Sequence, residues 1–385
     1  MTKKTIIYNH IAPRFSEMEI EMVHHIPQWW NWKDIPAPTK SKRIERIRET
    51  WWRTTLYWRL KEDAPSYTIS TYFNRMWNGT FIHPNQDRLI SIREWARLQS
   101  FPDNFILKWT KTSQYKQVWN AVPVLLARAI AEEISKYTKN KNIVDLFCWI
   151  WWMTQWFHME WFKTIWSIEI DEHIYNTFIH NHWIKDSYIH WDISLDETKK
   201  LLIKKLEWKK VWLIIWGPPC QGFSLAWLRL KDDPRNKLFL EYVHLVDKLK
   251  PNIFIMENVP WILSMNKWKD FEAIIKEFKN IWYYINSVFK LNAEEYWVPQ
   301  KRKRVFIIWT KENIKISEPK PLFWKEWLPK PITVKEAIWS LPIIWAPWWD
   351  HEIEVQYNPQ STYEKLMNWE INFKEFYKKI KEWYR

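Results

Sequence analysis

The chain has 385 residues and a formal net charge of +14. This length allows one large domain with a smaller one, and a basic excess of this size favours a polyanionic partner such as nucleic acid; the alternative is a solvated basic surface. Two cysteines, Cys148 and Cys220, exclude a disulfide framework and fit a reducing compartment. No apolar run is long enough for a signal peptide or a membrane span, so we expect a cytoplasmic protein without a membrane partner.

The abnormal feature of the composition is 35 tryptophans against three glycines. Average usage predicts about 27 glycines in a chain of this length. Turns and helix ends need glycine for positive φ, and tryptophan cannot replace it there. Doublets at 29–30, 51–52, 151–152 and 348–349 follow no periodicity that a core would use. We hypothesise that most of these positions are glycine in the organism's own protein, through a UGA codon that the host reads as glycine.

The first 80 residues are basic and irregular. One helix is predicted around 40–49, and alternation predicts a strand over 66–73. The helix carries four cationic side chains that are candidates for phosphate contacts, with a solvated helix face as the alternative: Lys42, Arg43, Arg46 and Arg48.

Two helical segments follow. A serine at position 91 before Arg-Glu predicts the start of a short helix that ends before Pro102. Residues 124–137 predict an amphipathic helix, and a short polar linker over 138–142 comes after it.

From residue 143 onwards, apolar strands alternate with helical segments. Strands are predicted at 143–147, 164–170, 211–215, 253–256 and 305–308, with a further short strand before 191. This alternation predicts an α/β fold with a mostly parallel, Rossmann-like sheet and helices on both faces. Residues 311–385 are Pro-rich and then basic.

Several motifs resemble those of the DNA (cytosine-5)-methyltransferases. Residues 217–224 (Gly-Pro-Pro-Cys-Gln-Gly-Phe-Ser) resemble the nucleophile loop, and residues 145–152 resemble the first motif with tryptophan at each expected glycine. Residues 88–102 and 114–123 resemble the ninth and tenth motifs, which stand after the eighth in the usual order. The chain therefore resembles a circularly permuted member of the family. Termini that lie close together at the surface tolerate such a cut.

The resemblance implies the catalytic residues. Cys220 would add to C6 of cytosine as a thiolate, which is the nucleophilic form of cysteine. Glu257 matches the sixth motif and would assist at N3, while Arg302 and Arg304 match Gln-x-Arg-x-Arg. In the family the second arginine contacts the base and the first helps to hold the site. Without the motifs, each residue has a simpler interpretation. A cysteine after a strand is more often an inert core residue, and an acid at that place is more often a group at a helix N-terminus. Two arginines at the start of a strand can be a solvated basic strand end.

The implied methyl donor is S-adenosylmethionine, and no metal is implied. By motif, Phe147 would pack on the adenine and Glu169 would accept from the ribose hydroxyls. The other positions implied to contact the cofactor are Trp149, Trp151, Ile170, Asp192, Ile193, Pro219 and Asn120. As written, indoles at 149 and 151 would fill the cleft that glycine leaves open.

The resemblance also implies an organisation and partners. Residues 81–310 would form the catalytic domain, with the ninth and tenth motifs at 81–137 and the first to eighth at 143–310. Residues 1–80 and 311–385 would together supply the target-recognition region. The implied partners are double-stranded DNA and a cognate restriction endonuclease, for a protein that acts as a monomer. Two alternatives stay open: an RNA (tRNA) cytosine-5 methyltransferase, and a catalytically dead DNA-binding protein if the tryptophans are real.

Overall fold

The computed structural model describes residues 4–50, 56–70, 73–146, 157, 162–182, 188–190, 192–193, 195–217, 234–264, 269–312, 314–321, 330–344 and 352–383. The chain forms two compact units, and both are discontinuous in sequence. Unit 1 consists of Met1–Pro123, Ala293–Arg302 and Leu322–Arg385, and unit 2 of Val124–Asn292 and Lys303–Pro321. Compactness does not report on DNA recognition, so the division into catalytic and target-recognition regions stays a prediction.

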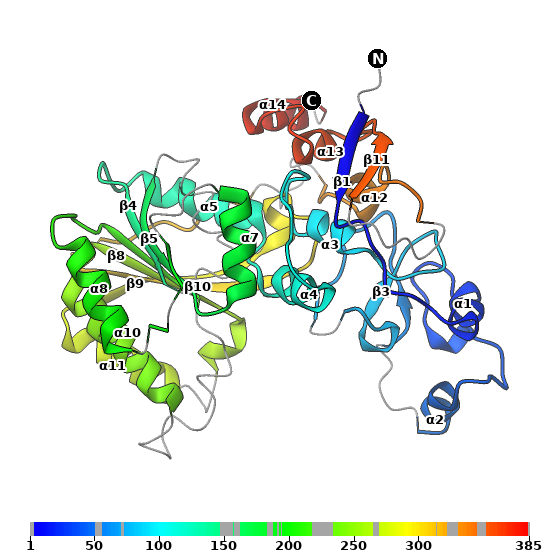
Figure 1. Cartoon of the computed structure of the whole chain (residues 1–385), viewed down its shortest axis with the longest axis horizontal. Helices are drawn as coiled ribbons and strands as arrows, with labels where there is room; N and C mark the ends of the chain where they lie inside the picture. Colours follow the sequence, from blue (N-terminus) through cyan, green and yellow to red (C-terminus); the bar gives the residue numbers. More distant parts are fainter. Residues whose placement is uncertain are drawn as a thin grey trace. The chain divides into compact units, whose positions relative to one another are not determined.

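Unit 2 is built on a sheet of seven strands in the order β6-β5-β4-β7-β8-β10-β9 (Figure 1). Strands β6, β5, β4, β7 and β8 are parallel, and β10 runs antiparallel to both β8 and β9. The bounds are β4 (Asn142–Leu146), β5 (Lys163–Ile168), β6 (Tyr188–Ile189), β7 (Leu213–Trp216), β8 (Ile253–Asn258), β9 (Tyr284–Asn292) and β10 (Lys303–Thr310). The predicted α/β sheet is confirmed, and β9 is a strand that the sequence did not indicate.

Helices cover both faces of this sheet. The helices of unit 2 are α5 (Val124–Ser135), α7 (Glu172–His182), α8 (Asp196–Leu206), α10 (Pro234–Leu249) and α11 (Lys269–Asn280). One face packs against α8, α10 and α11 in a single apolar cluster that includes Ile214, Tyr242 and Phe278. The alternate residues Leu213 and Ile255 are also buried, so the opposite face is covered too. Figure 1 shows α5 on that side.

Unit 1 joins the two ends of the chain. Its helices and strands are β1 (Lys4–Tyr8), α1 (Glu17–His24), α2 (Lys42–Thr50), β2 (Trp58–Arg59), β3 (Thr80–Ile82), α3 (Ile92–Leu98), α4 (Lys111–Asn120), α12 (Val334–Ile338), β11 (Glu352–Gln356), α13 (Thr362–Met367) and α14 (Phe373–Trp383). Strand β1 pairs antiparallel with β11, with Ile6 opposite Glu354 (Figure 1). Segments near opposite termini therefore form one two-stranded sheet.

Side-chain caps explain where several helices of unit 1 begin. Ser91 caps α3 by accepting from the amide of Glu94, and the Glu94 carboxylate accepts from the amide of Ser91. The same reciprocal capping box begins α1, α12 and α13. The helix predicted to start at Ser91 is therefore confirmed, and its capping box is a motif that the sequence shows.

Two local predictions for the first 80 residues were incomplete or wrong. The segment is more regular than expected, because β1 and α1 precede the predicted helix, which is α2. The strand predicted over 66–73 is wrong for the described residues of that stretch. They form only an isolated bridge between Ser66 and Gln300. The alternation of polar and apolar residues does not give a strand here, because no neighbouring strand continues the pairing beyond this bridge.

Candidate functional site

The predicted site residues of unit 2 gather at one edge of the sheet. Strands β4 to β8 are parallel, so their carboxyl ends lie at the same edge, and β10 begins there because it is antiparallel. Glu169 follows β5, Asp192 follows β6, Gly217 follows β7, Glu257 lies near the end of β8 and Arg304 near the start of β10. Open α/β sheets bind ligands at this carboxyl edge.

Glu257 and Arg304 form an ion pair, with Arg304 Nε 2.8 Å from Glu257 Oε1. Both side chains are largely buried, at 14% and 12% exposure, so dissolved salt screens this pair less than it would screen a surface pair. Register explains the contact: Glu257 lies opposite Phe306, two residues beyond Arg304. A Cβ atom at Gly217 would lie 3.7 Å from Glu257 Oε2. The backbone that enters the predicted nucleophile loop therefore passes beside this carboxylate.

Five predicted site residues lie outside the described part of the chain. These are the nucleophile Cys220 and the predicted cofactor contacts Phe147, Trp149, Trp151 and Pro219. Their roles stay predictions. The residues just before their two segments are Leu146, which ends β4, and Gly217, which follows β7. Both are at the carboxyl edge.

The predicted ribose-binding acid lies in a tight turn after β5. Glu169 is buried, and its Oε1 accepts from the backbone amides of Ile170 at 2.9 Å and Asp171 at 3.0 Å. The Ile170 side chain is 61% exposed, whereas Ile193 is buried as a member of the apolar core. An acidic acceptor next to an exposed apolar side chain is a chemical match for ribose hydroxyls and an adenine face. These residues therefore fit the cofactor that the motifs imply.

One contact at this turn was not predicted. Nε2 of His190, which directly follows β6, lies 3.1 Å from the carbonyl oxygen of Ile170, and the ring stacks on Tyr175 of α7. A single histidine after a two-residue strand follows no pattern that sequence reasoning could use.

The other two predicted residues lie in unit 1. Arg302 is buried, and its guanidinium donates to the backbone carbonyls of Trp119 at 2.7 Å and Ile69 at 3.5 Å. Asn120 is the half-buried last residue of α4, directly after Trp119. Arg302 thus holds the carboxyl end of the helix that carries Asn120.

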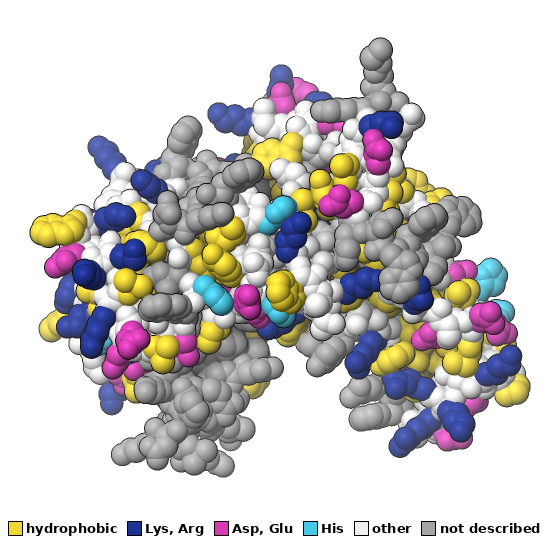
Figure 2. Space-filling view, viewed as in Figure 1, with side chains coloured by type: hydrophobic (Ala, Val, Ile, Leu, Met, Phe, Trp, Pro, Cys, Tyr) yellow, Lys and Arg dark blue, Asp and Glu magenta, His cyan; other side chains and the backbone are white. Residues whose placement is uncertain are grey.

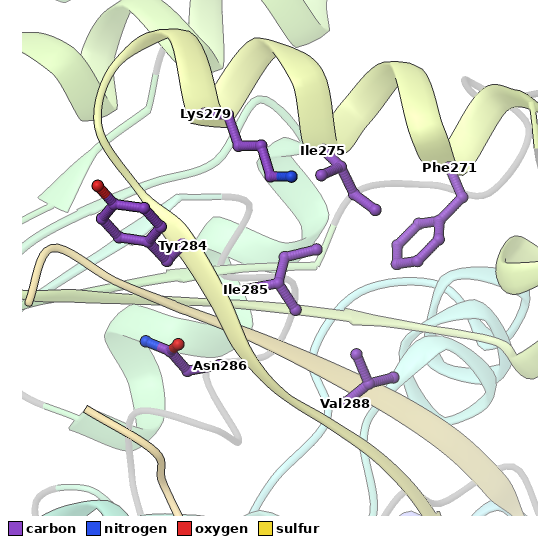
Figure 3. Close-up of a pocket in the computed structure, with 7 residues that line it drawn as sticks. All are labelled: Phe271, Ile275, Lys279, Tyr284, Ile285, Asn286 and Val288. Atoms are coloured by element: carbon purple, nitrogen blue, oxygen red, sulfur yellow. The ribbon is translucent and has the colours of Figure 1, made fainter. Parts of the chain in front are cut away.

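A pocket of about 430 Å³ lies between α11 and β9, away from these residues. Figure 3 shows Ile275 and Ile285 facing each other across it, with Lys279 and Tyr284 at one end. It adjoins the first half of β9, whereas Asn292 at the end of β9 pairs with Lys303 at the carboxyl edge. The pocket is therefore not part of the candidate site.

The described residues contain no group of three or more His, Cys, Asp or Glu that could hold a metal ion. They also contain no helix with the length and hydropathy needed to cross a bilayer.

Curated relatives at 34–42% identity are type II methyltransferases. M.DdeI of Desulfomicrobium norvegicum is 35% identical over 234 residues, which cover 59% of this chain and 54% of that protein. M.MthTI of Methanothermobacter thermautotrophicus is 42% identical over 153 residues, 37% of this chain and 44% of the relative. M.AquIA of a Picosynechococcus strain is 34% identical over 225 residues, 53% of this chain and 90% of the relative. The matching part of this chain spans about half the length of M.DdeI and of M.MthTI.

The family model for C-5 cytosine-specific DNA methylases matches residues 6–136 and 141–385, which is nearly the whole chain. It includes the Glu257–Arg304 pair and the segments of the carboxyl edge. On this coverage, the chain belongs to the C-5 cytosine-specific DNA methylase family.

Proposed function

We propose that this protein transfers a methyl group from S-adenosylmethionine to C5 of cytosine in duplex DNA. The observation that carries the proposal is the Glu257–Arg304 pair beside Gly217, where the predicted nucleophile loop begins. The target carbon is covered by stacking in the duplex, so the base must be flipped out at a cost of a few kcal/mol. Contacts between a basic protein surface and the DNA phosphates would hold the duplex while the base is flipped out.

The proposed chemistry follows from the low nucleophilicity of C5. The Cys220 thiolate forms a bond to C6, which makes C5 an enamine-like carbon able to accept the methyl group. Glu257 assists by donating a proton or hydrogen bond at N3, and Arg304 holds that carboxyl group in place. The C5 proton then leaves to a base or to water, any proton given to N3 returns to Glu257, and the sulfur–C6 bond breaks. The products are 5-methylcytosine, the free thiolate and, from the methyl donor, S-adenosylhomocysteine.

The cofactor supplies the electrophilic methyl group when bound. Glu169 is the acceptor for its ribose hydroxyls, and Ile170 and Ile193 are the apolar partners for its adenine. Asp192, Asn120 and the predicted residues 147, 149, 151 and 219 complete the proposed contacts.

Replacing the nucleophile and the acid tests the reaction. Cys220→Ser should abolish transfer of labelled methyl groups to duplex DNA while gel retardation of DNA persists. Glu257→Gln should slow transfer by about 10²–10⁴-fold, the usual contribution of acid–base catalysis. Glu272→Gln, an exposed acid on α11, is the matched control and should be neutral. Turnover by Cys220→Ser would remove Cys220 from this role, and methylation of tRNA in place of DNA would favour the RNA alternative.

We further propose that the chain is circularly permuted. The family model matches in two segments that break between residues 136 and 141, where the linker after the tenth-motif helix was expected. The pairing of β1 with β11 brings the two end regions of the chain together in one unit. Both observations are what a relocated cut would produce.

The hypothesis that many tryptophans stand for glycine gains support from the backbone. Within the described part of the chain, nine non-glycine residues have φ between 44° and 82°, and five of them are tryptophan: Trp29, Trp109, Trp282, Trp297 and Trp369. A left-handed backbone is unfavourable for bulky residues and is readily adopted by glycine. In addition, three buried indole N–H groups have no hydrogen-bond partner within the described structure: those of Trp95, Trp166 and Trp309.

Codon reading and substitution test this hypothesis. UGG codons at these positions would end it. If the codons are UGA, Trp149→Gly with Trp151→Gly should create or strengthen binding of S-adenosylhomocysteine in calorimetric titration. Trp282→Gly should stabilise the chain by roughly 1 kcal/mol because φ is 66° there. Trp208→Gly, at an exposed residue without positive φ, is the matched control and should not stabilise it.

The remaining proposals concern partners. The relatives are named as type II methyltransferases, which supports a place in a restriction–modification system with a cognate endonuclease. We propose that the protein acts as a monomer on DNA in the cytoplasm, since the family's substrate is found there. Size-exclusion chromatography with light scattering would test the monomer.

A further inference from the structure

The turn after β5 and the end of β6 leave the sheet side by side. Ile168 pairs with Ile189 across these parallel strands, so the next residues, Glu169 and His190, emerge as neighbours. Nε2 of His190 then lies 3.1 Å from the carbonyl oxygen of Ile170. A carbonyl can only accept, so Nε2 carries the proton and donates.

The same turn is held from its other side by Glu169. Its Oε1 accepts from the amides of Ile170 and Asp171, while His190 binds the carbonyl of Ile170. Both polar groups of the Ile170 backbone are thereby engaged. The turn that presents the proposed ribose acceptor is fixed on both sides by hydrogen bonds.

The His190 ring is itself held by aromatic stacking. Its centroid lies 5.2 Å from that of Tyr175, with 17° between the ring planes. Tyr175 in turn contacts Tyr188 at 5.0 Å. Helix α7 and strand β6 therefore set the direction of the imidazole before any ligand binds, which is how a rigid supporting group preorganises a site.

We propose that His190 is a positioning residue for the cofactor. It acts through the Ile170 carbonyl and keeps the Glu169 turn in the shape that receives the ribose. This inference rests on the proposed function, because it assumes that Glu169 binds S-adenosylmethionine. It assigns no chemical step to His190, so cofactor affinity should depend on this residue while the turnover rate at saturation should not.

Two substitutions separate the hydrogen bond from the stacking. His190→Gln keeps an amide donor near the position of Nε2 but loses the aromatic ring. His190→Phe keeps the ring but loses the donor, and His190→Ala loses both. His244→Ala, at an exposed histidine on α10, is the matched control. The measurement uses the full-length chain, as written or with Trp149→Gly and Trp151→Gly, in whichever form binds S-adenosylhomocysteine.

For His190→Phe and His190→Ala, we expect the dissociation constant of S-adenosylhomocysteine to rise about five- to tenfold, the effect of one lost hydrogen bond. His190→Gln should stay within about twofold of the parent, as should His244→Ala. The KM for DNA and kcat at saturating cofactor should not change. Without cofactor, hydrogen exchange at the amides of Ile170 and Asp171 should accelerate in His190→Phe and His190→Ala but not in His190→Gln.

Normal affinity in His190→Phe together with weak binding in His190→Gln would overturn the proposal, because stacking would then be what matters. Unchanged affinity and exchange in all variants would overturn it as well, while methyl transfer by the parent would leave the proposed function intact. If neither parent form binds S-adenosylhomocysteine or transfers methyl groups, the proposed function fails and takes this inference with it.

Discussion

Two arginines of one motif, two residues apart, have different partners. Arg304 pairs with the Glu257 carboxylate at the carboxyl edge, whereas Arg302 donates to the backbone carbonyls of Trp119 and Ile69. The role expected of Arg302, to help hold the site, stays a prediction, and in the structure its guanidinium fixes the local backbone. A guanidinium is suited to both tasks, because it offers five donors in a rigid plane.

Buried histidines make the stability of unit 1 depend on pH. Burial lowers the pKa of His10 to about 4 and that of His83 to about 3, and the nearby Arg88 acts in the same direction in both cases. In the fold, Nε2 of His10 donates to the Pro342 carbonyl and Nδ1 faces Ser91 Oγ, both at 2.8 Å. The neutral ring is thus fully satisfied.

His83 has a further reason to stay neutral. Its Nδ1 accepts from the backbone amides of Asn85 and Gln86, both at 3.1 Å. A proton on Nδ1 would convert this acceptor into a donor that points at two other donors. Glu94 lies nearby and favours the charged ring, but the desolvation caused by burial is the larger effect.

We therefore predict that unit 1 loses stability as the pH falls from about 6.5 toward 4. In this window the unfolded chain binds protons that the folded chain excludes, so the free energy of unfolding decreases with decreasing pH. Urea unfolding at pH 7 and pH 5 should differ by at least about 1 kcal/mol. Although burial alone would raise the pKa of Glu94, Arg88 holds it well below its usual value of 4.5. Its contribution to stability is therefore lost only as the pH falls below about 4.5, outside the comparison of pH 7 with pH 5. His83→Asn should reduce the pH dependence and His25→Asn, at an exposed residue, should not. An equal slope in both variants would contradict the prediction.

At the scale of elements, a buried ion cluster ties α3 to the carboxyl-terminal helices. Arg97 on α3 donates from Nε and Nη2 to the two carboxylate oxygens of Asp103, at 2.8 Å and 2.7 Å. Its Nη1 lies 3.1 Å from the Ala337 carbonyl at α12 and 3.5 Å from Glu364 Oε1 on α13. Arg97 and Glu364 are fully buried, so residues 267 positions apart share one desolvated charge network.

We predict that Arg97→Met destabilises unit 1 by about 3–5 kcal/mol, because it leaves two carboxylates buried without their cation. Chemical denaturation monitored by tyrosine and tryptophan fluorescence would measure this. Lys4→Ala is the matched control, since Lys4 also bridges the chain ends through Glu354 but both side chains are mostly exposed. It should cost less than about 1 kcal/mol. A similar loss in the two variants would show that the buried network is not what holds these elements together.

Sequence patterns predicted the elements whose periodicity or caps are local. The parallel strands β4, β5, β7 and β8 are apolar runs, and α3 begins at a capping box. Strand β9 was missed because the adjacent polar residues Asn286 and Ser287 break the alternation that is typical of a strand, and its pairing with β10 is not visible in the sequence. The ion pair of Glu257 and Arg304 depends on register across two strands. His190 depends on a stack with another element. Neither register nor stacking can be read from the sequence.

At the scale of the whole molecule, the net charge of +14 does not say which surface meets DNA. Figure 2 shows lysine and arginine side chains on the visible surface of both units. Helix α2 in unit 1 exposes three cations: Lys42, Arg43 and Arg46. Lys42 and Arg46 lie on the side away from the buried Ile44 and Ile47, whereas Arg43 flanks Ile47 and its guanidinium lies 4.3 Å from the Trp77 ring centroid. Arg48 does not join them, because it pairs with Glu45 at 2.9 Å. In unit 2, α8 and the residues after it expose Lys200, Lys204 and Lys209.

These two basic surfaces differ in their relation to the candidate site. Helix α8 leads into the start of β7, which is the opposite edge of the sheet from the carboxyl edge where Glu257 lies. DNA held with its target base at the carboxyl edge would not be expected to contact α8. Helix α2 belongs to unit 1, which contains the proposed target-recognition segments. The two surfaces therefore allow a comparison at equal charge.

We predict that α2 binds phosphates and α8 does not. The triple variant Lys42→Gln, Arg43→Gln, Arg46→Gln should weaken DNA binding and flatten the plot of log affinity against log salt by up to about 3, since each phosphate contact contributes about 0.9 to the slope. The variant Lys200→Gln, Lys204→Gln, Lys209→Gln removes the same charge and should leave the slope nearly unchanged. Fluorescence anisotropy with one labelled duplex between 50 and 200 mM salt, about the range in which such effects are large, measures both. Equal flattening in the two variants would mean that the net charge and not a defined surface attracts DNA. An unchanged slope in the α2 variant would place the phosphate contacts elsewhere in the molecule.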